Sequence, residues 1–253
     1  MDNITWEVRD NIGIIALHNP PENYLLNPDF LPMEVLKQWT SADGLKGILF
    51  CAGGKHFSGG GKLENLFAMI DANENLQARM DAGKALLDYL ENLNIPTVAA
   101  IQGICFGGGL EIALACHIRV CSDNALFAFP EINRGILPGL GGTVRTRELA
   151  GFPATLKMVL GGDMINADEA LELKLVDCIT TKSGLYGHAF NLLKKMTFDR
   201  SPEVIHGVMQ ALQNSRKLSR QEAMFQETRI FCELAMAEAL KRKISVDEPG
   251  RGF

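Results

Sequence analysis

Apolar runs that end in clusters of glycine are the feature of this sequence that most restricts its fold. Residues 47–52 form a short apolar run, and the glycine-containing stretch 56–62 follows it closely. Residues 96–101 form a second such run, followed by the stretch 102–111 with three consecutive glycines. Short apolar runs between turn signals are typical of buried strands. The sequence therefore predicts an α/β fold whose buried strands lead into glycine turns.

Hydrophobic periodicity predicts the other elements. We expect a hairpin of strands 4–9 and 12–17, a helix from Pro28, helices over 76–93 and 110–115, and strands over 118–121 and 125–128. From about Gly142 the pattern is mainly helical, and a long amphipathic helix begins near Leu218. We therefore expect an α/β core over residues 1–195 and a helical C-terminal region over residues 196–253.

Size and charge exclude several classes of function. The chain has 253 residues, which is enough to bury one large core, and its formal net charge of −5 argues against a broad nucleic-acid surface. The N-terminus lacks the pattern of a secretory signal, and the apolar stretches are too short to span a membrane. Six cysteines without a Cys-x-x-Cys spacing indicate reduced thiols and no metal site. We expect a cytoplasmic protein.

The first glycine turn, residues 56–62, contains Gly59, Gly60 and Gly61 directly before Lys62. Consecutive glycines permit positive φ angles and let a ligand approach the backbone closely. Exposed N–H groups in such a turn bind an oxyanion. A glycine run alone also fits a flexible surface loop, so this segment needs support from a second one.

The second glycine turn, residues 102–111, joins a strand to a helix. The N-terminus of a helix presents unpaired N–H groups, and glycine removes the Cβ that would block them. The alternative is a tight turn that serves packing alone. Glu111 argues against that alternative, because the apolar residues 112–115 follow it and desolvation there raises the pKa of a carboxyl group.

A second carboxylate stands in residues 129–142, where Glu131 precedes a turn rich in proline and glycine. Alone, Glu131 also fits a solvated loop. Together with Glu111 it forms a pair of carboxyl groups that could share one water molecule in general acid and base catalysis.

These three segments together resemble the crotonase, or enoyl-CoA hydratase/isomerase, family. The resemblance covers nearly the whole chain and is most specific at residues 57–61, 107–111 and 130–143. It implies repeated ββα units wound into a superhelix. It also implies that the C-terminal helices build a homotrimer or a dimer of trimers.

The resemblance also implies roles for individual residues. The backbone N–H groups of Gly61 and Gly108 would form an oxyanion hole for the thioester oxygen. Glu131 would supply or receive the proton of the α-carbon, and Glu111 would activate water for the β-carbon. The residues expected along the substrate and coenzyme A are Phe57, Ser58, Gly59, Gly60, Lys62, Gly109, Pro138 and Gly139. Further candidates for the coenzyme A phosphates are Lys241, Arg242 and Lys243.

The family pattern favours reversible syn hydration of a 2-enoyl-CoA, since both Glu111 and Glu131 are present. Coenzyme A would enter only as part of the substrate, without another cofactor. Lys62 departs from the acidic residue usual in the family, which leaves the substrate open. The alternatives are an enoyl-CoA isomerase, or a polyketide-pathway dehydratase or decarboxylase acting on a thioester bound to a carrier protein. A relative that only binds CoA esters or RNA is a non-enzymatic alternative.

Overall fold

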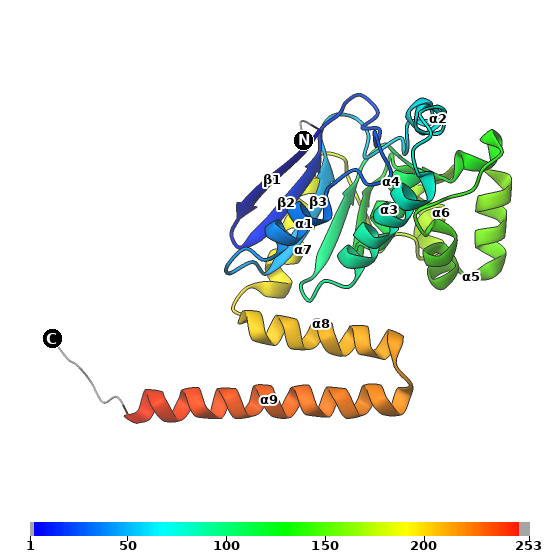
Figure 1. Cartoon of the computed structure of the whole chain (residues 1–253). Coiled ribbons are helices and arrows are strands. Elements are labelled where there is room, and N and C mark those ends of the chain that lie inside the picture. Colours follow the sequence, from blue (N-terminus) through cyan, green and yellow to red (C-terminus); the bar gives the residue numbers. More distant parts are fainter. Residues whose placement is uncertain (1–2, 248–253) are drawn as a thin grey trace. The chain divides into compact units, whose positions relative to one another are not determined.

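The computed structural model describes residues 3–247, which form two compact units with the boundary between Met196 and Thr197 (Figure 1). The first unit holds every described strand, and the second consists of helices. No helix within the described residues is long and apolar enough to cross a membrane.

A six-stranded sheet forms the centre of the first unit. Its order is β1-β2-β3-β4-β6-β9, with β1 and β2 antiparallel and every later pair parallel. The strands are β1 (Ile4–Arg9), β2 (Ile12–Leu17), β3 (Gly47–Ala52), β4 (Thr97–Ile101), β6 (Ile118–Ser122) and β9 (Cys178–Thr180). The predicted hairpin and the predicted strand over 47–52 are confirmed.

A smaller sheet has the order β5-β7-β8, from β5 (Ile104–Phe106), β7 (Leu126–Ala128) and β8 (Ile165–Asn166). Strand β4 is followed by β5 and then by helix α4 (Gly108–Ala115). Strand β6 is followed by β7, the 3₁₀ helix η1 (Pro130–Arg134) and α5 (Gly142–Gly161). The order strand, strand, helix therefore occurs twice, and each repeat adds one strand to each sheet.

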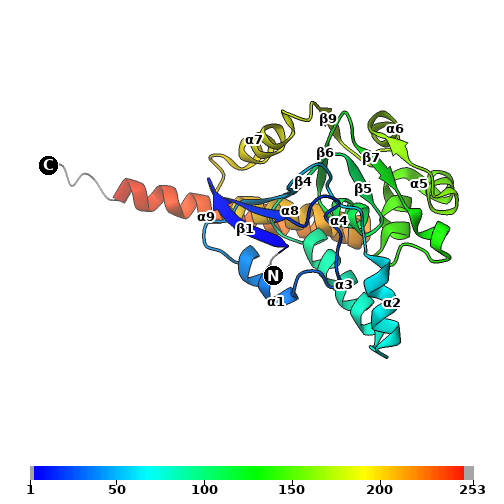
Figure 2. The same cartoon turned by 90° about the horizontal axis from the view of Figure 1, so that it is seen from above.

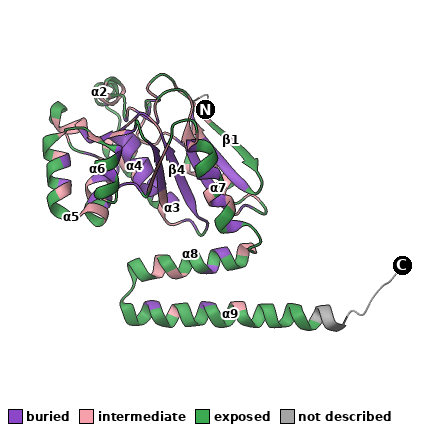
Figure 3. Ribbon diagram, turned by 180° about the vertical axis from the view of Figure 1, so that it is seen from behind, coloured by how far each residue is buried: buried purple, intermediate pink, exposed green. Residues whose placement is uncertain are grey.

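Helices cover both faces of the large sheet (Figure 2). On one face, α7 (Leu185–Thr197) packs Leu185, Ala189 and Leu193 against residues of the strands such as Leu49 and Val98. The opposite side carries α1 (Met33–Thr40) and α3 (Leu76–Glu91), as Figure 2 shows. Helix α4 is buried at all of its residues, which Figure 3 shows in purple. The remaining helices of this unit are α2 (Leu63–Asp71) and α6 (Ala167–Glu172).

Two helix starts differ from the sequence-based predictions. The helix expected from Pro28 begins at Met33, with Pro32 as its N-cap at φ −59°. Proline disfavours helical geometry in the residue before it, so a helix readily begins just after Pro32. Helix α4 begins at Gly108, two residues before the predicted Leu110, and Glu111 therefore lies in its first turn.

The second unit consists of α8 (Pro202–Lys217) and α9 (Arg220–Asp247), which run antiparallel (Figure 1). Gly207 is buried where the two helices meet, and a Cβ there would lie 3.0 Å from atoms of Ile230 and Leu234. The small residue thus permits the close approach of α8 and α9.

Candidate active site

Parallel pairing of successive turns brings the two predicted oxyanion donors together. Ser58, which follows β3, forms a parallel bridge with Cys105 of β5. Gly61 and Gly108 each lie three residues beyond this bridge, so they lie at the same level. A Cβ built on Gly108 would lie 3.7 Å from the backbone nitrogen of Gly61. The two glycine turns that the sequence analysis singled out are therefore neighbours.

Two other glycines are required by this close packing. Gly60 has φ +87°, and a Cβ there would lie 2.7 Å from the carbonyl oxygen of Phe106. Gly107 has φ +48°, and its Cβ would collide with the Glu131 carboxyl group. Side chains rarely adopt such φ angles, so both turns depend on glycine. At Gly61, in contrast, a Cβ would meet nothing within 4 Å.

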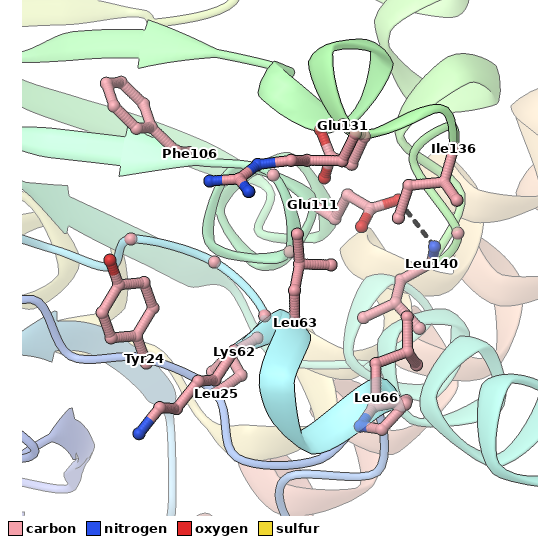
Figure 4. A pocket seen from close by; sticks show the side chains of 18 of the residues that line it. Tyr24, Leu25, Lys62, Leu63, Leu66, Phe106, Glu111, Glu131, Ile136 and Leu140 are labelled. Atoms are coloured by element: carbon pink, nitrogen blue, oxygen red, sulfur yellow. Dashed lines mark hydrogen bonds between the residues drawn. The ribbon is translucent and has the colours of Figure 1, made fainter. Parts of the chain in front are cut away.

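A cavity of about 340 Å³ opens beside these turns (Figure 4). Gly61, Gly108, Glu111 and Glu131 all line it, so the structure brings the four predicted catalytic residues to one place. Gly59, Gly60, Lys62 and Gly139 line it as well. The rest of the wall is largely apolar and comes from residues such as Leu25, Leu63, Leu66, Met80, Phe106, Ile136 and Leu140. The cavity thus combines apolar walls with a few polar groups, as small-molecule sites do.

Glu111 is held by one of its two carboxyl oxygens. Its Oε1 accepts hydrogen bonds from the backbone N–H groups of Leu140 and Gly142, both at 2.7 Å, and Figure 4 shows the bond from Leu140. Oε2 has no hydrogen-bond partner among the described residues. Burial, assisted by the nearby charge of Glu131, raises the pKa of Glu111 to about 7, although the two N–H donors and Arg145 oppose the shift. Glu111 therefore changes protonation state near neutral pH.

Glu131 lies on η1, which turns back toward the cavity after β7. Its Oε2 is buried and has no hydrogen-bond partner within residues 3–247. Desolvation by burial raises the pKa of this carboxyl group as well. Figure 4 shows the carboxyl groups of Glu131 and Glu111 at the same wall of the cavity. Two carboxyl groups with a free oxygen each can pass protons to and from a bound molecule.

Four residues expected along the substrate do not line this cavity: Phe57, Ser58, Gly109 and Pro138. The side chains of Phe57 and Ser58 are fully buried. Phe57 packs near Phe50, and the Ser58 hydroxyl donates to the Asn23 carbonyl at 2.8 Å. A Cβ on Gly109 would collide with Ser58. These residues shape the turns from within, which leaves the side chains of Phe57 and Ser58 no exposed surface for a ligand.

The cationic side chains considered for phosphate binding belong either to the cavity or to helix α9. Lys62 is the N-cap residue of α2, and in Figure 4 its side chain extends away from Glu111 and Glu131. Arg134 at the end of η1 also lines the cavity. Lys241, Arg242 and Lys243 belong to α9, and Arg242 pairs with Glu238 at 3.1 Å.

Within the described residues, no group of three or more His, Cys, Asp or Glu side chains could hold a metal ion.

Several residues of the site were not predicted from the sequence. Leu63, Leu66 and Met80 come from helices α2 and α3, whose periodicity predicted helix but not which residues face a ligand. Arg134 stands three residues after Glu131, and residues three apart eclipse in a 3₁₀ helix such as η1. The sequence patterns did not predict this 3₁₀ helix, so they gave no signal for Arg134.

The stacked strand, strand, helix repeats, the neighbouring glycine turns and the two desolvated carboxyl groups are the features of a crotonase fold. The family model of enoyl-CoA hydratase/isomerase matches residues 7–247. The chain belongs to the enoyl-CoA hydratase/isomerase family.

Named relatives agree with this family. A probable enoyl-CoA hydratase from Bacillus subtilis is 29% identical over 245 residues, which cover 96% of this chain and 95% of that protein. The fatty acid oxidation complex subunit alpha of Idiomarina loihiensis is 36% identical over 222 residues, or 84% of this chain. The match covers only 31% of that subunit, so the chain corresponds to about a third of its length.

Solved structures show the same fold. Enoyl-CoA hydratase from Bacillus anthracis superposes with a TM-score of 0.83 at 24% identity, over 95% of this chain and 96% of that one. DspI from Pseudomonas aeruginosa gives a TM-score of 0.81 at 27% identity, over 92% of this chain and 89% of that one.

The contrast between Gly60 and Gly61 yields a matched test of the glycine turn. Gly61→Ala should keep the fold and the ligand-binding cavity, because its Cβ would enter open space. Gly60→Ala should lower the free energy of unfolding by about 1–3 kcal/mol, because alanine is strained at φ +87° and crowds the Phe106 carbonyl. Urea denaturation of both variants measures the difference. Equal stability of the two variants would contradict the described turn.

The raised pKa of Glu111 predicts a pH-dependent stability. Between the ordinary pKa of 4.5 and about 7, the native state keeps the Glu111 proton and the unfolded state releases it. Unfolding therefore becomes easier as pH rises through this window. Glu111→Gln removes this effect, so its stability relative to wild type should increase by up to about 3 kcal/mol from pH 4.5 to pH 8. Urea denaturation at both pH values measures it, and a constant difference would refute the assignment.

Proposed function

We propose that this protein hydrates 2-enoyl-CoA thioesters, and dehydrates the 3-hydroxy products in the reverse direction. The observation that carries the proposal is the pair of free, desolvated oxygens, Oε2 of Glu111 and Oε2 of Glu131, on one cavity beside Gly61 and Gly108. The names of two relatives, an enoyl-CoA hydratase and a fatty acid oxidation subunit, support this choice of reaction.

In the proposed reaction, the thioester oxygen accepts hydrogen bonds from the N–H groups of Gly61 and Gly108. These donors hold the oxygen more tightly as it gains enolate charge, and one such donor contributes roughly 10²–10³ in turnover in other enzymes. The apolar wall around Leu63 and Leu140 would receive the acyl chain and exclude water from it.

The two carboxyl groups would divide the proton transfers. Ionised Glu111 takes a proton from water through Oε2, and the water oxygen bonds to the β-carbon while the double-bond electrons move to the thioester oxygen. Protonated Glu131 then donates its proton to the α-carbon as the enolate collapses. After one turnover Glu111 is protonated and Glu131 is ionised. Proton exchange with solvent restores the starting state of both groups. Because the two groups interact, their titration belongs to the pair.

The carrier end of the substrate would meet cationic groups at the cavity. Neither Lys62 nor Arg134 has an acidic partner among the described residues, so both are available for phosphate oxygens. A free CoA ester and a thioester on a carrier protein present the same phosphopantetheine arm. We propose that the substrate is the free CoA ester. If the protein converts only thioesters bound to a carrier protein, and no free CoA ester, the carrier protein is the partner instead.

The α8–α9 unit supports the proposal of a homo-oligomer. Its exposed apolar side chains include Val208, Leu212, Phe225, Phe231, Met236 and Leu240. Large apolar side chains left exposed on one pair of helices are candidates for burial in a protein interface. We expect a trimer or a hexamer by light scattering, with Phe231→Asp shifting it toward the monomer. A wild-type monomer would refute this proposal.

Two carboxyl groups on the same cavity provide a test of the reaction. Hydration of a short 2-enoyl-CoA is followed as a fall in enoyl absorbance, and Glu131→Gln should show no such fall. Its affinity for coenzyme A, measured by calorimetry, should stay unchanged. Glu64→Gln is the matched control, because Glu64 also lines the cavity but lies on α2. It should retain turnover within about tenfold, the scale of a mere binding effect.

Unchanged turnover in Glu131→Gln would refute the role of Glu131. If wild type leaves 2-enoyl-CoA esters unchanged but converts a 3-enoyl ester into its 2-enoyl isomer, the protein is an isomerase of the same family.

A further inference from the structure

Arg145 is a buried arginine whose every donor nitrogen has a partner. Its side chain is 6% exposed, and it lies in the first turn of α5. Nη2 bonds to Asp88 at 2.6 Å and Nε to Glu91 at 2.8 Å, both on α3. Nη1 donates to the carbonyl oxygen of Leu140 at 2.8 Å. Arg145 therefore fastens α3 to the loop that enters α5.

That loop is the one that holds Glu111. Leu140 accepts from Arg145 through its carbonyl group and donates to Glu111 Oε1 through its N–H group. Gly141 accepts a hydrogen bond from the backbone N–H of Arg145 at 3.0 Å, and Gly142 donates to Glu111 Oε1. A continuous chain of hydrogen bonds thus runs from α3 through Arg145 and the loop to Glu111.

Arg145 also acts on Glu111 through its charge. The charged groups around the Glu111 carboxyl are Glu131, which raises its pKa, and Arg145, which lowers it. Asp88 and Glu91 partly neutralise Arg145, yet its positive charge still counteracts the desolvation of Glu111. Loss of Arg145 would remove this charge and loosen the two N–H donors, and both changes destabilise the ionised carboxylate.

We propose that Arg145 is a positioning residue that holds the Leu140–Gly142 loop, so that Glu111 Oε1 is fixed and Oε2 faces the reacting water. This inference rests on the proposed function for the role of Glu111. It adds a residue that does not line the cavity and does not touch the substrate.

The chain provides a matched control in Arg119. Its side chain is 5% exposed and also bonds to two backbone carbonyls, those of Leu175 at 2.8 Å and Cys116 at 2.6 Å. It pairs with one acid, Asp177, at 3.1 Å. In the described part of the chain, no hydrogen bond connects Arg119 or its partners to Glu111. Arg119→Met therefore measures the general cost of losing a buried arginine.

The experiment compares Arg145→Met, Arg145→Lys and Arg119→Met at matched folded fractions. In Arg145→Met, kcat should fall on the order of 10²-fold with little change in KM, the scale of a catalytic group displaced by about 1 Å. The acid limb of the kcat/KM profile should move to higher pH, because Glu111 must be ionised to activate water. Arg145→Lys should keep the limb near its wild-type position, since the charge remains, but lower kcat. Arg119→Met should lose stability alone.

A second readout does not depend on turnover. Titration of the Glu111 carboxyl carbon by ¹³C nuclear magnetic resonance, assigned with Glu111→Gln, should give a higher pKa in Arg145→Met than in wild type or Arg119→Met. An unchanged Glu111 titration would overturn the inference, as would equal kinetic losses in the two methionine variants. If wild type hydrates no enoyl thioester, the proposed function fails, while the titration still decides the role of Arg145. If Arg145→Met does not fold, reduced kcat in Arg145→Lys with unchanged KM supports the inference, and wild-type kcat refutes it.

Discussion

The parallel bridge between Ser58 and Cys105 is the constraint on which the rest of the site depends. It sets the register between two successive turns, and the pairing of Cys105 with Phe127 continues that register to the next repeat. Because parallel partners advance together along the chain, Gly61 and Gly108 reach the same level, and Glu131 follows shortly beyond β7. A slip of one residue at this bridge would separate the two N–H donors.

Burial is the second constraint, because the site removes two carboxyl groups from much of their contact with water. Burying an acid costs free energy unless hydrogen bonds or an opposite charge stabilise its ionised form. Two backbone N–H groups and Arg145 stabilise the ionised form of Glu111. Their effect is smaller than the cost of burial, so the pKa of Glu111 stays raised. Glu131 has even fewer compensating contacts at Oε2. The fold thus gives up stability here, and carboxyl groups with pKa values raised in this way are common at functional sites.

Sequence patterns predicted elements well where a single periodicity dominates. The strands over 47–52 and 97–101 and the helix over 76–91 lie where the apolar runs and helical spacing placed them. The helix after Pro28 began later than predicted, because Pro32 determines where it can start. The burial of the Phe57 and Ser58 side chains was not predicted, because sequence proximity to a glycine turn does not reveal which side of the turn is buried.

By itself, the sequence determined the α/β class, the glycine turns and the four residues that meet at the cavity, because strand patterning, glycine geometry and the family motifs are local properties. Only the tertiary structure decided which walls enclose the cavity, with Leu63 and Met80 coming from separate helices. It also revealed the link from Arg145 through Leu140 to Glu111, which joins residues 34 positions apart. Such contacts depend on how helices pack over a sheet, and no local pattern in the chain encodes the distance between them.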